Sequence, residues 1–224
     1  YVLLNFVNSK RDVSTIAHEL GHSMHSFYSS SNQNVIDANY TIMVAEVAST
    51  VNEILLSEYQ IKNEKDKKKK AEILYELLEM IRATFFRQAM FAEFEKIVHE
   101  KIENKQILSA EDLNKIYYKL NQKYFGNNMI IDDEIKYEWA RIPHFYTDFY
   151  VYKYSTGISA AICIASNILK QGETFVNRYI EMLKQGCSKK SIELLKMVDV
   201  DLESTNVYQN TADFYNEKLK QLKE

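Results

Sequence analysis

Eight residues near the start of the chain concentrate the side chains best suited to holding a metal ion. The stretch HELGHSMH, His18 to His25, contains three of the five histidines in the chain, together with one glutamate. On a helix, His18 and His22 project from one face and can hold one metal ion between two imidazoles. Glu19 lies next to that face, where it can take a proton from a metal-activated water without binding the metal itself. This pattern is typical of zinc hydrolases.

Two histidines leave a tetrahedral zinc ion short of its third protein ligand. His25 is the nearest candidate, but a straight helix would have to bend to bring it to the same ion, so we expect a supporting or packing role for it. The metzincin arrangement needs a glycine at position 25 and is therefore excluded. The alternative that these are ordinary polar residues on an exposed helix face stays open, although this spacing seldom arises by accident.

The segment VAEVASTVNE offers a better third ligand. Glu46 and Glu53 are seven residues apart and share one helical face, while most of their neighbours are apolar. A mostly buried helix should not carry two carboxylates without partners. We expect Glu46 to bind the zinc and Glu53 to orient a ligand histidine or to hold charge near the metal. Gly21 weakens its helix by about 1 kcal/mol, which fits close packing of another backbone against it.

Long helices must position these residues. The 224 residues include only 5 Gly and 1 Pro, so most of the breakers that tight β-turns require are missing. We expect one mainly α domain over residues 1–224, with a short N-terminal strand at YVLLNF and a loop at SSSNQN. Asp12 or Ser14 is expected to cap the first helix. Apolar spacing predicts helices from about residue 12 to the SSSNQN loop and over about 40–59, 71–104, 109–125, 155–169, 173–184, 189–196 and 205–222.

Composition excludes several classes of function. A net charge of -3 argues against a general nucleic-acid binder, which needs clustered Lys and Arg. The two cysteines make no disulfide framework and no leader-like segment is visible, so we expect a cytoplasmic location. No 18-residue apolar run is present, so we expect no membrane-spanning helix.

Three blocks in matching order carry a family resemblance: DVSTIAHELGHSMHS, DANYTIMVAEVASTVNEILL and YEWARIPHFYTDFYVYKYSTGISAA. Together they closely resemble the oligoendopeptidase F group of the thimet-type oligopeptidase family of zinc metallopeptidases. The resemblance covers nearly the whole chain and corresponds to the C-terminal, catalytic part of such enzymes. It implies a zincin-like, mostly helical body around a channel that admits short peptides, one zinc ion per chain, and Glu46 as the downstream ligand. We expect the chain to be a fragment of a longer protein whose N-terminal region completes the channel.

The block RIPHFYTDFYVYKYSTG is rich in neutral hydrogen-bond donors. Attack of water on a peptide carbonyl creates an oxyanion, which a tyrosine hydroxyl or a histidine N–H can stabilise. His144 and Tyr150 are the preferred candidates, and the family has a similar His-then-Tyr block. Tyr154 lies four residues after Tyr150 and joins them on the same face if the segment is helical. The alternative, that these tyrosines are packing aromatics, stays open.

The sequence therefore predicts a zinc-dependent endopeptidase that hydrolyses short peptides, with no nucleic-acid or membrane partner. Glu19 would take the proton of the attacking water and deliver it to the leaving amine. One alternative is a zinc carboxypeptidase or dipeptidase on a similar helical channel. The other is a helical fragment that binds peptides without cutting them.

Overall fold

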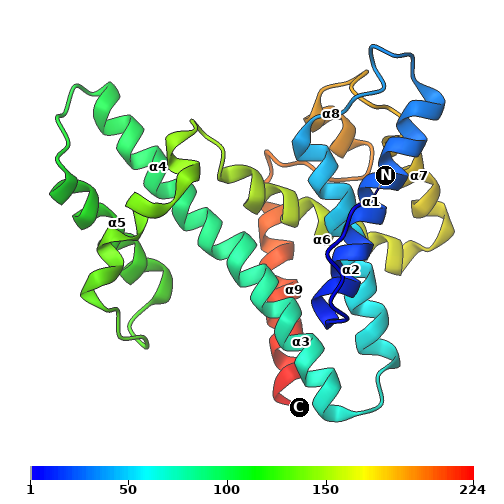
Figure 1. The fold of residues 1–224 in the computed structure, drawn as a ribbon, viewed down its shortest axis with the longest axis horizontal. Coiled ribbons are helices and arrows are strands. Elements are labelled where there is room, and N and C mark those ends of the chain that lie inside the picture. The colour runs from blue at the N-terminus through cyan, green and yellow to red at the C-terminus, as the bar shows by residue number, and fades with distance from the viewer. Residues whose placement is uncertain (1) are drawn as a thin grey trace. The chain divides into compact units, whose positions relative to one another are not determined.

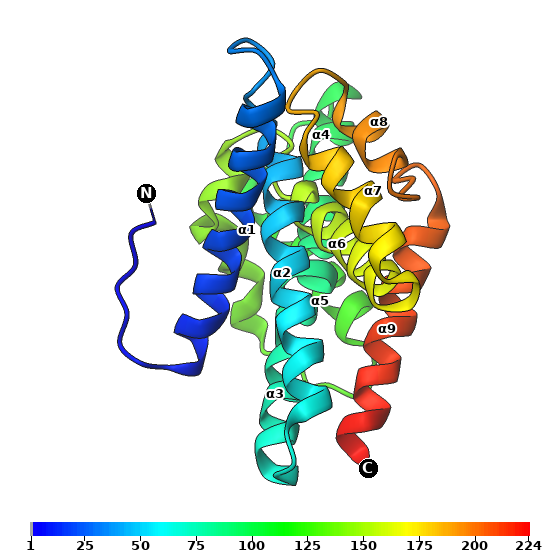
Figure 2. The ribbon, with the colours of Figure 1, turned by 90° about the vertical axis from the view of Figure 1, so that its right-hand side faces the viewer.

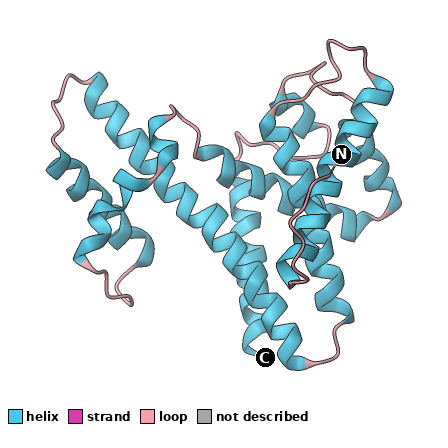
Figure 3. Cartoon of the chain, viewed as in Figure 1, coloured by secondary structure: helices cyan, strands magenta, loops and turns pink. Residues whose placement is uncertain are grey.

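The computed structural model describes residues 2–224, and the secondary structure in this part of the chain is helical, with no strand (Figures 1 and 3). The prediction of a mainly α fold is confirmed. The chain divides into two compact units: residues up to Ile81 together with Thr156–Glu224 form the first unit, and Arg82–Ser155 form the second. That residues 1–224 act as a single catalytic domain stays a prediction.

Helices from both ends of the sequence build the first unit. In this unit α1 packs along α2, α2 packs against α3, and α3 packs against the C-terminal α9. Figure 2 shows α1 and α2 side by side along their lengths. The helices are α1 (Lys10–Asn32), α2 (Ile42–Asn63), α3 (Lys67–Ile81), most of α6 (Tyr152–Gln171), α7 (Glu173–Leu183), α8 (Ser191–Lys196) and α9 (Thr205–Lys223).

The core of the first unit gathers around α2. Many apolar side chains of α2 are fully enclosed, and Val47 and Val51 are 0% exposed. Burial of such side chains from water is the main favourable contribution to folding, at about 25 cal/mol per Å². The side chains that pack with them come from α6, α7 and α8 and include Ala160, Ile164, Phe175, Met182 and Leu195. The apolar character of α2 therefore reflects its central position, and α1 lies against one of its faces.

The contact between α1 and α2 depends on one glycine. A Cβ atom placed on Gly21 would lie 2.5 Å from the Cα atom of Ser49 and 2.8 Å from the carbonyl oxygen of Ala48. Only glycine leaves room for backbone at these distances. The predicted close packing at Gly21 is confirmed, and it fixes the separation of the two helices that carry the candidate metal ligands.

An aromatic core holds the second unit together. Phe94 and Phe145 pack with ring centroids 5.0 Å apart. Phe94 also lies against the fully buried ring of Tyr117, and Phe145 lies against the ring of Phe91. The indole N–H of Trp139 donates a hydrogen bond to Asn114 at 2.8 Å. The elements are the π-helical turn η1 (Arg82–Phe86), α4 (Arg87–Glu103), α5 (Ala110–Phe125), η2 (Asp133–Arg141) and η3 (Pro143–Tyr146).

Three local predictions near the N-terminus were wrong. Helix α1 is capped by Ser9, and Asp12 is the third residue of the resulting capping box, so neither Asp12 nor Ser14 is the cap. Ser29–Asn32 continue α1, because the Ser29 hydroxyl donates to the Ala38 carbonyl at 2.5 Å and Ser29 packs fully buried. The strand expected at residues 1–6 is absent from residues 2–6, since no described segment pairs with it and a strand needs a hydrogen-bonded neighbour. Tyr1 lies outside the described residues.

The remaining expectations concern cysteines and membranes. Cys163 is buried and Cys187 is exposed, and both are free thiols. A reducing, cytoplasmic location stays a prediction. Among the described residues, none of the helices combines the length and apolar character needed to cross a bilayer.

Candidate metal centre

Three predicted ligands meet at the contact between α1 and α2. His18 and His22 lie one turn apart on α1, and Glu46 reaches them from the first turns of α2. One ligand atom from each residue lies within 4.8 Å of the others. The two Nε2 atoms are 3.1 Å apart, and the Nε2 atom of His18 is 3.7 Å from a carboxylate oxygen of Glu46. The structure thus brings together the three residues that the sequence assigned to the metal.

These distances fit a tetrahedral zinc site. Zinc binds imidazole nitrogen at about 2.0–2.1 Å, which separates two ligand atoms of a tetrahedron by about 3.3 Å. The observed 3.1 Å between the imidazole nitrogens lies close to that separation. The Glu46 carboxylate is 3.7 Å from the Nε2 atom of His18, and the three ligand atoms lie within 4.8 Å of one another, so Glu46 would move closer to bind the same ion. Two imidazoles and one carboxylate form a ligand set known in catalytic zinc sites, which keep a fourth position for water or substrate.

Glu53 supports His18 from the side away from Glu46. A carboxylate oxygen of Glu53 lies 3.4 Å from the Nδ1 atom of His18, and the Ser14 hydroxyl donates to the other carboxylate oxygen at 3.1 Å. Glu53 raises the pKa of His18, first through its hydrogen bond and then through its charge, to which Glu46 adds. A proton held on Nδ1 by a carboxylate leaves Nε2 free to bind a metal, which is how such pairs orient ligand histidines.

The prediction that Glu46 and Glu53 are both enclosed is only partly correct. The side chain of Glu53 is 19% exposed, whereas that of Glu46 is 49% exposed. Glu46 stands at the edge of the contact between α1 and α2 and meets solvent, although Val44, Ala45 and Val47 beside it are buried. An accessible carboxylate suits a ligand at a site that substrate must reach.

His25 lies against a tyrosine and inside the protein. The residue is 1% exposed, and its ring stacks on that of Tyr40 with centroids 3.6 Å apart. The Tyr40 hydroxyl lies 2.6 Å from the Ser26 hydroxyl and donates to the carbonyl of His22 at 3.4 Å. Burial, with a smaller contribution from the charge of His22, lowers the pKa of His25 to about 4, so the ring is neutral at pH 7. Its contacts are those of a packing residue.

His144, Tyr150 and Tyr154 lie in the second unit and contact one another. The Tyr154 hydroxyl is 3.2 Å from the Nε2 atom of His144. The Tyr150 ring stacks on the His144 ring with centroids 5.2 Å apart, and the ammonium of Lys153 lies 4.8 Å from the Tyr150 centroid. The structure therefore groups the predicted site residues in two sets, the ligand set with Glu19 in the first unit and this cluster of donors in the second.

Sequence reasoning missed three residues that hold the ligand set in place. Ser14 was considered only as a cap, although it stands four residues before His18 and so shares its face. The Asn52 amide donates to the Ala17 carbonyl at 3.2 Å and ties α2 to α1. Nothing in the sequence indicated that Tyr40 supports the site, because its partner His25 is distant in sequence. Their stacking depends on how the loop before α2 folds back.

Comparison with known proteins adds an independent line of evidence. The sequence profile of peptidase family M3 matches residues 1–214. The chain is 47% identical over its full length to "Oligopeptidase PepF" of Bacillus subtilis (strain 168), of which it covers 33%. It is 43% identical over its full length to "Oligoendopeptidase F homolog" of Borreliella burgdorferi, of which it covers 38%.

A solved structure shows the same fold. The crystal structure of oligoendopeptidase-F from Enterococcus faecium superposes with a TM-score of 0.85 at 39% identity, covering 95% of this chain and 39% of that one. The chain thus spans about a third to two fifths of the length of these proteins. Since the family profile covers nearly all of its residues, the chain belongs to peptidase family M3.

Proposed function

We propose that this chain is the catalytic part of a zinc-dependent endopeptidase that hydrolyses short peptides. The observation that carries the proposal is the set of ligand atoms from His18, His22 and Glu46, all within 4.8 Å of one another, with Glu19 directly following one ligand on α1. Membership of peptidase family M3 supports peptide bonds as the substrate, and the names of the relatives support cleavage within short peptides.

The residues of this chain have separate tasks in the proposed reaction. Zinc, when bound by His18, His22 and Glu46, would lower the pKa of water and polarise the scissile carbonyl. Glu19 accepts the proton of the attacking water and passes it to the nitrogen of the leaving amine. Glu53 keeps His18 in the orientation that presents Nε2 to the metal.

We assign oxyanion stabilisation to the donors of the second unit. His144, Tyr150 and Tyr154 are in mutual contact, and a tyrosine O–H or a histidine N–H can stabilise a developing negative charge by donating a hydrogen bond to it. Replacing Tyr150 by Phe removes one donor and keeps the ring. We expect kcat to fall by about a hundredfold while KM changes little, since this contact forms only in the transition state. A change in KM alone would assign Tyr150 to substrate binding.

The direct test of the chemistry is the Glu19→Gln variant. Glutamine keeps the shape of the side chain but cannot accept the proton, so turnover of a quenched fluorescent peptide should fall by at least about a hundredfold. Zinc content should remain that of the wild type, since Glu19 is not a ligand. Glu103→Gln, at an exposed position of α4 in the second unit, is the matched control and should keep full activity. Retained turnover in Glu19→Gln would remove the residue from the mechanism.

Peptides with blocked ends separate endopeptidase activity from its alternatives. An endopeptidase cleaves peptides that are acetylated and amidated, whereas a carboxypeptidase or dipeptidase needs a free end. Binding without cleavage of either peptide would favour the non-catalytic alternative. Because the relatives are about three times as long as this chain, we further propose that a region outside these 224 residues helps to enclose the peptide.

A further inference from the structure

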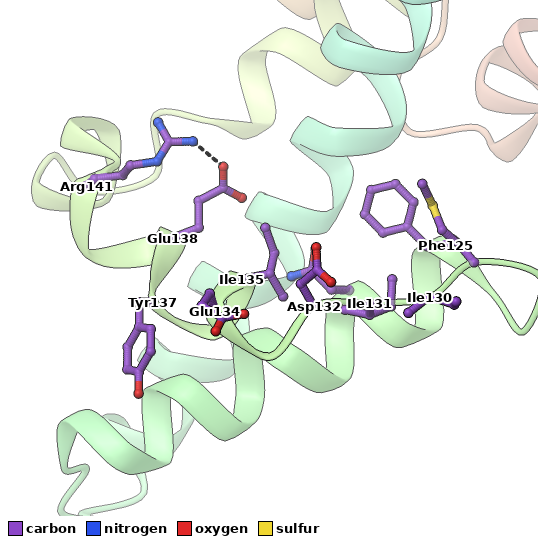
Figure 4. Close-up of a pocket in the computed structure, with 11 residues that line it drawn as sticks. Phe125, Ile130, Ile131, Asp132, Glu134, Ile135, Tyr137, Glu138 and Arg141 are labelled. Atoms are coloured by element: carbon purple, nitrogen blue, oxygen red, sulfur yellow. Dashed lines mark hydrogen bonds and ion pairs between the residues drawn. The ribbon is translucent and has the colours of Figure 1, made fainter.

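A cavity lies wholly within the second unit, formed by the end of α5, the loop that follows it and η2. Its volume is about 520 Å³, within the range of about 300–1,000 Å³ usual for ligand sites. Figure 4 shows Ile135 and Asp132 between Glu138 on one side and Phe125 on the other. None of the proposed metal ligands and none of the proposed oxyanion donors lines it.

The walls of this cavity are mainly apolar and accessible. Ile130 is 94% exposed, Met129 is 56% exposed and Phe125 is 41% exposed, all within a few residues of sequence. Ile131 and Ile135 extend the same surface. A cluster of large apolar side chains that remains open to solvent is typical of a surface that receives another apolar group.

Carboxylates outnumber cations among the polar groups of the cavity. Asp132, Glu134 and Glu138 contribute three carboxylates, and Arg141 is the one cationic side chain among the described lining residues. The Glu138 carboxylate already has three partners. It forms ion pairs with Arg141 and Arg87, and it accepts a hydrogen bond from the Tyr117 hydroxyl at 2.6 Å. The carboxylates of Asp132 and Glu134 have no ion pair with any described residue. The cavity therefore has a surplus of negative charge, from Asp132 and Glu134, beside its apolar walls.

A buried amide adds a further acceptor. Asn121 lines the cavity and is only 1% exposed. Its amide nitrogen donates to the Tyr117 carbonyl at 2.9 Å, while its amide oxygen accepts no hydrogen bond from the described residues. The oxygen is not among the fully enclosed side-chain atoms, so it meets solvent at the cavity wall and can accept a hydrogen bond from a bound group.

We propose that this cavity binds a peptide segment in which apolar residues alternate with lysine or arginine. The apolar side chain would lie against Phe125, Met129 and Ile130, and the cation would meet Asp132 and Glu134. Charge complementarity favours this occupant, since the surplus carboxylates attract a cation and disfavour an acidic segment. The proposal does not rest on the peptidase activity, because none of these residues acts in the proposed chemistry.

The test uses two blocked peptides and the 224-residue Glu19→Gln chain without metal, so that no cleavage intervenes. One peptide is acetyl-Leu-Lys-Phe-Lys-Leu-amide, and the other has glutamate in place of both lysines. Titration calorimetry should give at least about tenfold tighter binding of the lysine peptide, equivalent to about 1.4 kcal/mol. Equal affinities, or binding of neither peptide, would overturn the proposal.

Two matched variants assign the binding to this cavity. Ile130→Lys places a cation at the cavity and should weaken the lysine peptide about tenfold or more. Ile107→Lys introduces the same change at a residue that is 96% exposed in the same unit but does not line the cavity, and should leave binding unchanged. Both positions are exposed, so folding should be unaffected. Unchanged binding in Ile130→Lys would place the peptide elsewhere, including at the metal centre, and would contradict the proposal.

The carboxylates provide a second, independent comparison. Asp132→Asn combined with Glu134→Gln removes the surplus charge without changing side-chain size, and should bring the two peptides to similar affinities. Glu103→Gln is exposed and outside the cavity, so it should preserve the preference for lysine. A preference that survives the double change would show that these carboxylates do not select the cation.

Discussion

At the scale of single residues, the candidate metal centre depends on the two nitrogens of His18. Its Nδ1 atom faces Glu53 at 3.4 Å and its Nε2 atom faces His22 and Glu46. One ring therefore connects a supporting carboxylate to a candidate ligand set. The supporting carboxylate is itself fixed by Ser14, so the tautomer of His18 is set by residues from both helices.

Removing the charge of Glu53, which supports His18, should weaken metal binding without removing a ligand. In Glu53→Gln the side chain keeps its size but loses its charge, and we expect zinc affinity to fall about 10–100-fold. Competition with a chromogenic chelator measures this affinity. The control is Glu111→Gln, at an exposed position of α5, which should bind zinc like the wild type. Unchanged affinity in Glu53→Gln would mean that Glu53 does not support the site.

His25 should make the stability of the metal-free protein depend on pH. Burial lowers its pKa from the ordinary 6.5 to about 4, so between these values the unfolded chain takes up a proton that the folded chain does not. Stability is therefore lost as pH falls from 6.5 towards 4, by about 2.5 kcal/mol at pH 4.5. His25→Phe keeps a ring beside Tyr40 but cannot titrate. Urea unfolding at pH 7.5 and pH 4.5 should show a smaller loss in the variant, and an equal loss would contradict the buried, neutral histidine.

The sequence alone was enough to select the candidate ligand residues but not everything that holds them. His18, His22 and Glu46 could be chosen because helical spacing is a property of the chain itself. Tyr40 and Asn52 could not, since their contacts with α1 depend on how two helices pack. The accessibility of Glu46 was also misjudged, because an apolar helix can still present one edge to solvent.

At the scale of elements, the closeness of α1 and α2 determines whether the ligands meet. We expect Gly21→Ala to push the helices apart, since its Cβ would lie 2.5 Å from the Cα atom of Ser49. Overpacking of this kind costs about 1–3 kcal/mol and should lower zinc affinity as well as stability. Chemical unfolding with and without zinc measures both effects.

Gly157 on α6 is the matched control for that change. A Cβ atom there would meet nothing within 4 Å, so no neighbouring atom approaches this glycine closely. Gly157→Ala should therefore stabilise the protein by up to about 1 kcal/mol through helix propensity. If Gly21→Ala were equally stabilising, the close contact between α1 and α2 would not exist in solution.

The helices themselves were largely predictable, and the errors have physical causes. The helix predicted to begin near residue 109 does begin there, because its start is fixed by a local pattern, the capping box of Ser109 and Asp112. The π-helical turn η1 interrupts one long predicted helix, and local apolar spacing gave no signal for it. The predicted N-terminal strand failed because strand formation depends on a partner elsewhere in the chain.

At the scale of the whole molecule, the chain is a helical protein of peptidase family M3 that carries its candidate metal ligands within one compact unit. All three ligands belong to α1 and α2, which pack on each other directly. The site should therefore form without any contribution from residues outside this chain. A ligand that binds only the folded state stabilises it, by about 2.7 kcal/mol at a hundred times its Kd.

The metal content of the purified chain tests this central claim most directly. Elemental mass spectrometry on protein prepared without added metal or chelator should find about one zinc ion per chain, and clearly less in Glu46→Ala, which lacks one ligand. Glu103→Ala, at an exposed position away from the site, should retain the wild-type content. A wild-type chain with no bound zinc, and none gained when zinc is supplied, would contradict the assignment of His18, His22 and Glu46 as a metal centre.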